Sequence, residues 1–134
     1  MSVNSFRDLR VWQAAMELVA SIYDVTKSFP TNETYGLVSQ MRRAAVSIPS
    51  NIAEGHTRES TKEYLHHISI AQASLAELQT QIEIAVMLKY LPGGEDHFLG
   101  RATSLSKQLY ALRNGLTRNL SQTPSPQPRI RKEA

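Results

Sequence analysis

The sequence predicts an all-α protein, an antiparallel up-down four-helix bundle, and three observations support this prediction. Four segments carry apolar residues at alternating spacings of three and four, which is typical of helices packed through one face. Turn-forming residues separate the segments, and no segment shows the polar-apolar alternation of a half-buried strand. The links are too short to cross the length of a helix, which favours antiparallel neighbours. We place the bundle at residues 1–120, a length that suffices for one hydrophobic core.

The first predicted helix follows a capping-box-like pair, Ser5 and Asp8, and ends before Phe29-Pro30. Its apolar residues form two adjacent seams. We assign the first seam to the bundle core: Leu9, Trp12, Met16, Val19, Tyr23 and Thr26. The second seam consists of Val11, Ala15, Leu18, Ile22 and Val25.

The two seams together cover more of the helix circumference than the stripe of roughly 100° that packing on one core requires. We therefore assign the second seam, from Val11 to Val25, to an interface between copies of the chain. The alternative is that a small bundle tolerates scattered exposed aliphatic side chains.

The second predicted helix has a single core seam that ends at Gly55, which we expect in a C-terminal cap position. Pro49 lies inside this helix. Because proline lacks the amide that would bond to the carbonyl of Ala45, we expect a kink or a short break there. The predicted core residues are Val38, Met41, Ala45, Ile48 and Ile52.

The third helix is opened by the capping box Ser60-x-x-Glu63 and closed by the turn at Pro92-Gly93-Gly94. Its core seam is Tyr64, Ile68, Ala71, Leu75, Leu78, Ile82 and Ala85. The fourth helix follows, with a core seam of Phe98, Ala102, Leu105, Leu109, Leu112 and Leu116.

Residues 121–134 differ in composition from the bundle. They hold three prolines and one large apolar residue, too little apolar surface to offset the entropy of ordering, so we expect a disordered basic tail. The tail also carries two of the three net positive charges of the chain, from Arg129, Arg131 and Lys132 against Glu133. It is either a solvated tail or an electrostatic arm for RNA or DNA.

Catalytic, metal and cofactor chemistry find little support in the sequence. There is no cysteine, and no nucleophile-elbow, phosphate-loop or H-E-x-x-H motif. His66 follows Glu63 by three residues, but a di-iron site needs a second such pair and two further inward glutamates. We expect no enzymatic activity, no metal and no cofactor.

The sequence also favours a location in the cytoplasm. Its apolar runs are far shorter than the roughly 20 residues of a membrane span, and its first residues lack the apolar region of a secretion signal. We expect a cytoplasmic protein without membrane contact.

Basic side chains of the second helix and the following turn are the candidate binding residues: Arg42, Arg43, Arg58 and Lys62. Two interpretations of the helix arginines remain open. They either bind nucleic acid or a partner, because guanidinium groups suit phosphate, or they are structural, paired with Glu54 or bonded to carbonyls that Pro49 leaves free.

Three strings of the chain closely resemble a known family. They are LRVWQAA from Leu9, YGLVSQMRRAAVSIPSNIAEG from Tyr35 and EYLHHISIAQASLAELQTQIEIA from Glu63. They resemble the S23-type four-helix-bundle family, also called the intervening-sequence proteins of 23S ribosomal RNA genes, over roughly residues 6–120.

The resemblance implies a homopentamer of up-down bundles. The family is also similar in fold to the accessory proteins of diversity-generating retroelements, which partner a reverse transcriptase and bind nucleic acid. From the residues and the resemblance together, we expect a non-enzymatic, homo-oligomeric protein that binds RNA or another nucleic acid. The alternative is a scaffold or accessory module, for example a reverse transcriptase partner, that makes no direct contact with nucleic acid.

Overall fold

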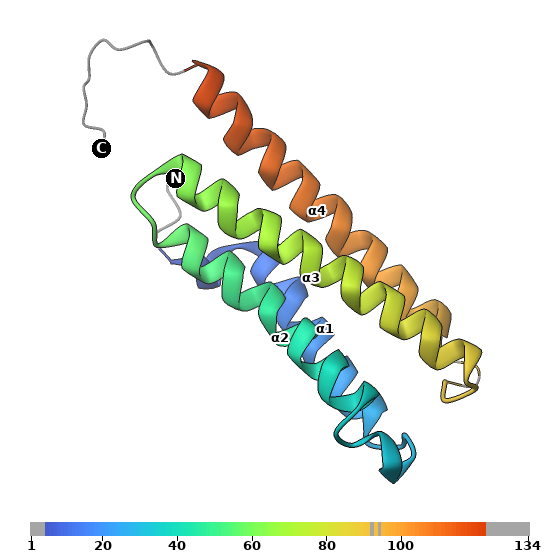
Figure 1. Cartoon of the computed structure of the whole chain (residues 1–134). Helices are drawn as coiled ribbons and strands as arrows, with labels where there is room; N and C mark the ends of the chain where they lie inside the picture. Colours follow the sequence, from blue (N-terminus) through green and yellow to red (C-terminus); the bar gives the residue numbers. More distant parts are fainter. Residues whose placement is uncertain (1–4, 92, 94, 123–134) are drawn as a thin grey trace.

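The computed structural model of the chain confirms four helices, and it describes residues 5–91, 93 and 95–122 (Figure 1). The helices are α1 (Arg10–Thr26), α2 (Leu37–His56), α3 (Thr61–Met87) and α4 (Glu95–Gln122), with two 3-10 turns, η1 (Phe6–Asp8) and η2 (Thr31–Glu33). Consecutive helices run in opposite directions (Figure 1). The α2–α3 interface is the most extensive, and α1 packs less closely on α4 than on α2. None of these helices combines the length and apolarity needed to cross a bilayer.

The predicted core of the last three helices is largely confirmed. Every predicted core residue of α2 is buried, and so is every one of α3 except the half-buried Tyr64. The first four predicted core residues of α4 are buried, whereas Leu112 and Leu116 are half-buried. α4 continues to Gln122, two residues past the predicted end of the bundle, and most of the predicted tail lies outside the described residues.

The structure places most of the core of α1 on the seam that was predicted for the interface. Of the predicted core seam, only Thr26 is buried, while Leu9, Trp12 and Val19 are half-buried and pack against the core. Met16 and Tyr23, predicted in the core, are 43% and 41% exposed. Four members of the predicted interface seam are instead buried within the single chain: Val11, Ala15, Leu18 and Ile22. The fifth, Val25, is half-buried. The assignment of this seam to an interface between copies is therefore corrected: these side chains form the chain's own core. The small Ala15 lets this side of α1 approach its neighbours, whereas the bulky Met16 and Tyr23 would hold them apart.

α2 differs from its prediction at two positions. It continues from Leu37 to His56 through Pro49 without a break. Gly55 lies within the last turn of α2, and Thr57 is the C-cap residue. A Cβ atom at Gly55 would lie 2.8 Å from Cδ1 of Tyr64 and 2.9 Å from Cβ of His67. Glycine is required here because α2 and α3 approach closely, and not because the helix needs a left-handed cap.

Side-chain hydrogen bonds hold the starts of α3 and α2, whereas the N-cap of α1, Leu9, makes none. The predicted capping of α3 is confirmed, because Oγ of Ser60 accepts a hydrogen bond from the amide of Glu63 at 3.0 Å. Ser5 caps the 3-10 turn η1 instead of α1, which begins at Arg10. At the other end of the bundle, Glu33 holds the start of α2. Its Oε1 accepts from the amide of Leu37 at 3.1 Å, and its Oε2 accepts from the hydroxyl of Tyr90 at 3.0 Å.

Candidate functional site

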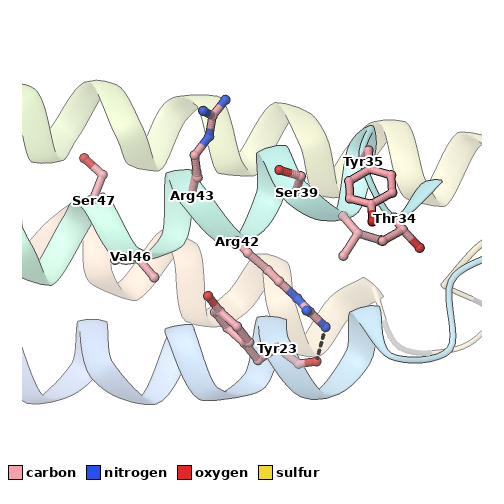
Figure 2. A pocket seen from close by; sticks show the side chains of 9 residues that line it. Tyr23, Thr34, Tyr35, Ser39, Arg42, Arg43, Val46 and Ser47 are labelled. Carbon is pink, nitrogen blue, oxygen red and sulfur yellow. Dashed lines mark hydrogen bonds between the residues drawn. The ribbon is translucent and has the colours of Figure 1, made fainter.

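A groove of about 550 Å³ lies beside the N-terminal half of α2. It is formed by the end of α1, the link between η2 and α2, and α2 itself (Figure 2). We call it the Arg43 groove. Its lining residues are Tyr23, Thr34, Tyr35, Val38, Ser39, Arg42, Arg43, Val46 and Ser47.

Arg42 is a structural residue of this groove. Its Nε donates to Oγ1 of Thr26 at 3.0 Å, and its Nη2 donates to the carbonyl of Tyr23 at 3.2 Å (Figure 2). The guanidinium also lies 4.6 Å from the centre of the Tyr23 ring. Arg42 therefore places positive charge at the C-terminal end of α1, where the carbonyls lack helical partners. This agrees with the structural interpretation of Arg42, although its partners are neither Glu54 nor the carbonyls near Pro49.

Arg43 differs from its neighbour. One residue along an α-helix turns the side chain by about 100°, and Figure 2 shows Arg43 directed away from α1. The side chain is exposed and makes no hydrogen bond or ion pair with any residue that the structure describes. Ser39 and Ser47 lie four residues before and after it on α2, and none of the nine lining residues is acidic. The groove thus presents a guanidinium whose charge is not neutralised.

The basic residues predicted for binding do not form one site. Arg58 and Lys62 line a separate cleft at the turn between α2 and α3, where Glu63, His66 and His67 also lie. His56, the last residue of α2, lies 13 positions after Arg43, so this cleft begins about 20 Å from Arg43 along the helix axis. The glutamate in the cleft opposes its positive charge. The predicted tail residues Arg129, Arg131 and Lys132 lie outside the described residues.

An uncharged groove of about 310 Å³ separates α1 from α2 on the outer surface. We call it the outer α1–α2 groove, and its lining residues are Trp12, Met16, Val19, Val46, Pro49, Ser50 and Ala53. Val46, which is 39% exposed, also lines the Arg43 groove, so the two grooves adjoin. The sequence pattern did not indicate this surface. Trp12, Met16 and Val19 were all predicted in the core, whereas Met16 is exposed and Trp12 and Val19 are half-buried. One feature of the sequence could have indicated this surface: Val46 is an apolar residue of α2 that lies off the core seam of that helix.

A ladder of polar side chains joins α2 to α3 on the adjacent flank. Ser74 donates to Oγ of Ser47 at 2.8 Å, and Nδ2 of Asn51 donates to the carbonyl of Ser47 at 2.9 Å. Nδ1 of His67 lies 3.0 Å from Oδ1 of Asn51 and 3.8 Å from a carboxylate oxygen of Glu54. These contacts satisfy polar groups between two packed helices and fix their register. The described residues include no group of three or more candidate metal-ligating side chains.

Comparison with known proteins identifies a family to which most of the chain is similar. A family model described as "23S rRNA-intervening sequence protein" matches residues 7–111, a range that includes α1, α2, α3 and more than half of α4. No curated protein matches the chain significantly. The match covers well over half of the sequence and agrees with the resemblance found in its RRAAVSIPSNIAEG string.

Proposed function

Because the chain belongs to the 23S rRNA-intervening sequence protein family, we propose that it acts by binding, without catalysis, and that its partner is RNA. The observation that carries this proposal is the exposed, unpaired Arg43 in a groove without acidic lining residues. An unneutralised guanidinium binds phosphate through charge-assisted hydrogen bonds. The chain's net charge of +3 adds a general attraction for nucleic acid.

The proposal includes self-association through the outer α1–α2 groove. This surface carries Trp12, Met16 and Val19 but no charged residue, a composition that suits an interface with a second copy. We propose a homo-oligomer, with the pentamer as the form that the family resemblance implies. A pentamer carries five times the net charge of one chain, and several weak phosphate contacts then act together on one RNA.

Titration of a labelled RNA with the full chain tests the RNA proposal. Affinity should fall steeply between about 50 and 200 mM salt, because phosphate contacts release counterions. Arg43→Ala should weaken binding and flatten the dependence of log affinity on log salt. Arg113→Ala, a change at an exposed arginine of α4, is the charge-matched control and should have a smaller effect. An Arg43→Ala protein that matches the control would remove the Arg43 groove from the proposal.

Deleting residues 121–134 asks separately whether the basic tail contributes. If the tail acts as an electrostatic arm, its deletion flattens the salt dependence further, because it removes three cationic side chains. An unchanged salt dependence would assign the tail to solubility alone.

A protein scaffold without nucleic-acid contact is the second candidate, and the uncharged outer α1–α2 groove favours it. In this case the groove receives another protein, such as a nucleic-acid-processing enzyme. Sedimentation of the full chain and pull-down from nuclease-treated lysate distinguish the two. Two results together would favour the scaffold over the self-associating RNA binder. The chain would sediment as a single-chain species, and it would retain a protein partner after nuclease treatment that the Met16→Glu variant loses.

A further inference from the structure

We infer that the Arg43 groove takes single-stranded RNA in preference to duplex RNA, and that the ring of Tyr35 is the surface on which a base stacks. This inference rests on the proposed function, because it names the form of nucleic acid that the same groove binds. It depends on the side chain of Tyr35, on the backbone that holds it, and on its position relative to Arg43.

Tyr35 is 95% exposed, the highest exposure among the large hydrophobic side chains that the structure describes as exposed. Its ring makes no aromatic or cation–π contact with another described residue. Both faces of the ring are therefore open to a ligand. A nucleic-acid base presents a flat apolar face, and stacking on a tyrosine tolerates any base. In a duplex those faces are already stacked on their neighbours, so only a single strand offers them freely.

The backbone that carries Tyr35 is held in place on its C-terminal side. The amide of Gly36 donates to the carbonyl of Glu33 at 3.0 Å. The carboxylate of Glu33 bonds to the amide of Leu37 at 3.1 Å and to the hydroxyl of Tyr90 at 3.0 Å. The link thus joins η2, α2 and the segment after α3 around the residue that carries the ring. A ring presented from a fixed backbone loses less entropy when it binds.

Tyr35 and Arg43 lie at a spacing that suits a short run of nucleotides. Tyr35 directly precedes Gly36, which is the N-cap residue of α2. Arg43 lies in α2, seven residues after Gly36. Seven helical residues span about 10 Å, which is about three nucleotides at the stacked spacing of 3.4 Å. A base on Tyr35 therefore leaves the phosphates of the next nucleotides within reach of Arg43. Ser39 lies between them on the groove wall (Figure 2).

The two other surfaces described above lack this combination. The cleft at Arg58 and Lys62 has cations, but its wall includes Glu63 and no tyrosine, tryptophan or phenylalanine. The outer α1–α2 groove has Trp12 but no charged side chain. In the described part of the chain, the Arg43 groove thus joins an open aromatic ring to an unpaired cation without an opposing carboxylate.

Fluorescence anisotropy of the full chain tests the inference with two probes, an unstructured labelled RNA and the same RNA annealed to its complement. The single strand should bind more tightly than the duplex. Tyr35→Ala should lower affinity for the single strand by about tenfold or more and change duplex binding little, whereas Tyr35→Phe should retain single-strand affinity because the ring remains. Arg43→Ala should weaken the binding of both probes.

Tyr110→Ala is the matched control, because Tyr110 is 57% exposed and lies on α4, which does not pack against α2. Equal affinity for the two probes, together with a Tyr35→Ala protein that behaves like this control, would overturn the inference and leave the RNA proposal standing. Failure of both probes to bind at low salt would overturn both. Circular dichroism of Tyr35→Ala should match the unmodified protein, since the side chain has no packing partners to lose.

Discussion

The two faces of α1 have similar apolar patterns and opposite environments. Leu18 on the inner face is 1% exposed, while Met16, two residues earlier, is 43% exposed. α2 shows the same contrast between two charged residues. Arg42 donates a hydrogen bond to the carbonyl of Tyr23 near the end of α1, whereas Arg43 has no partner among the described residues. Neighbouring residues of the same chemical class thus serve the fold in one case and remain available to a ligand in the other. In this bundle the direction of a side chain decides its role.

The largest effect is expected from placing a charge on the inner face of α1. Leu18→Glu would bury a carboxylate among apolar side chains, at a cost of several kcal/mol, and should abolish the cooperative thermal unfolding measured by circular dichroism. Met16→Glu should retain helicity and reduce the sedimentation coefficient of the oligomer. If Leu18→Glu instead gives a folded, smaller species, Leu18 belongs to an interface between copies and the contrast between the faces is broken.

A pair of glycines provides the second comparison. Gly55→Ala should destabilise the protein by about 1 to 3 kcal/mol, because the new methyl group would overlap Tyr64 and His67. Gly100→Ala on α4 meets no atom within 4 Å and should stabilise the helix by about 0.5 to 1 kcal/mol. Urea unfolding of both variants measures the difference. Equal effects of the two substitutions would contradict the close approach of α2 and α3 at Gly55.

Substitution of the two arginines of α2 should change the free energy of unfolding by different but smaller amounts. Arg42→Met removes charge-assisted hydrogen bonds to Thr26 and to the carbonyl of Tyr23, and we expect a loss of about 1 kcal/mol because the site is only half-buried. Arg43→Met should change the free energy of unfolding by less than about 0.5 kcal/mol. Its effect should instead be found in RNA affinity. A reversed order in urea unfolding would assign the structural role to Arg43.

The smallest expected effect on stability occurs only at alkaline pH and comes from Tyr90. The ring of Tyr90 packs on Phe29, in contrast to the exposed ring of Tyr35. The hydrogen bond to Glu33, followed by burial and by the nearby carboxylate charge, raises the pKa of Tyr90 above its ordinary value of 10.0. The pKa of the Tyr90 hydroxyl is higher in the folded protein than in the unfolded chain. At pH values between these two pKa values, the folded state therefore binds more protons than the unfolded state. The free energy of unfolding should therefore be unaffected by this group below about pH 9 and fall as pH rises above about 10.

Tyr90→Phe removes the titrating hydroxyl, so it should reduce this alkaline loss in urea titrations at several pH values. Burial also raises the pKa of Tyr64, and its titration leaves a residual loss in the variant. An alkaline loss that Tyr90→Phe leaves unchanged would contradict the contribution of the Tyr90–Glu33 hydrogen bond.

Much of the fold follows from local sequence patterns. The apolar spacing of α2, α3 and α4 identified buried residues such as Met41, Leu78 and Leu105, because each of these helices has one dominant apolar seam. The cap at Ser60 was also predictable, since a hydroxyl three residues before Glu63 forms a local hydrogen bond. The RRAAVSIPSNIAEG string was sufficient to indicate the family, which the match over residues 7–111 shows.

The candidate site was only partly predictable. The sequence identified Arg43 as a binding candidate, but it grouped it with Arg58 and Lys62, whose cleft begins about 20 Å away along α2. Tyr35 was missed, because nothing in its local sequence shows that the ring has no partner.

The sequence by itself determined the number of helices, their approximate limits and most of the apolar residues that α2, α3 and α4 bury, because these depend on contacts within a few residues of the chain. Only the tertiary structure decided which seam of α1 faces inward, why Gly55 must be small and which arginine is available to a ligand. These outcomes depend on the rotation of one helix against another. Two adjacent seams with the same spacing satisfy the same local rules, and only the packing of complete side chains selects between them.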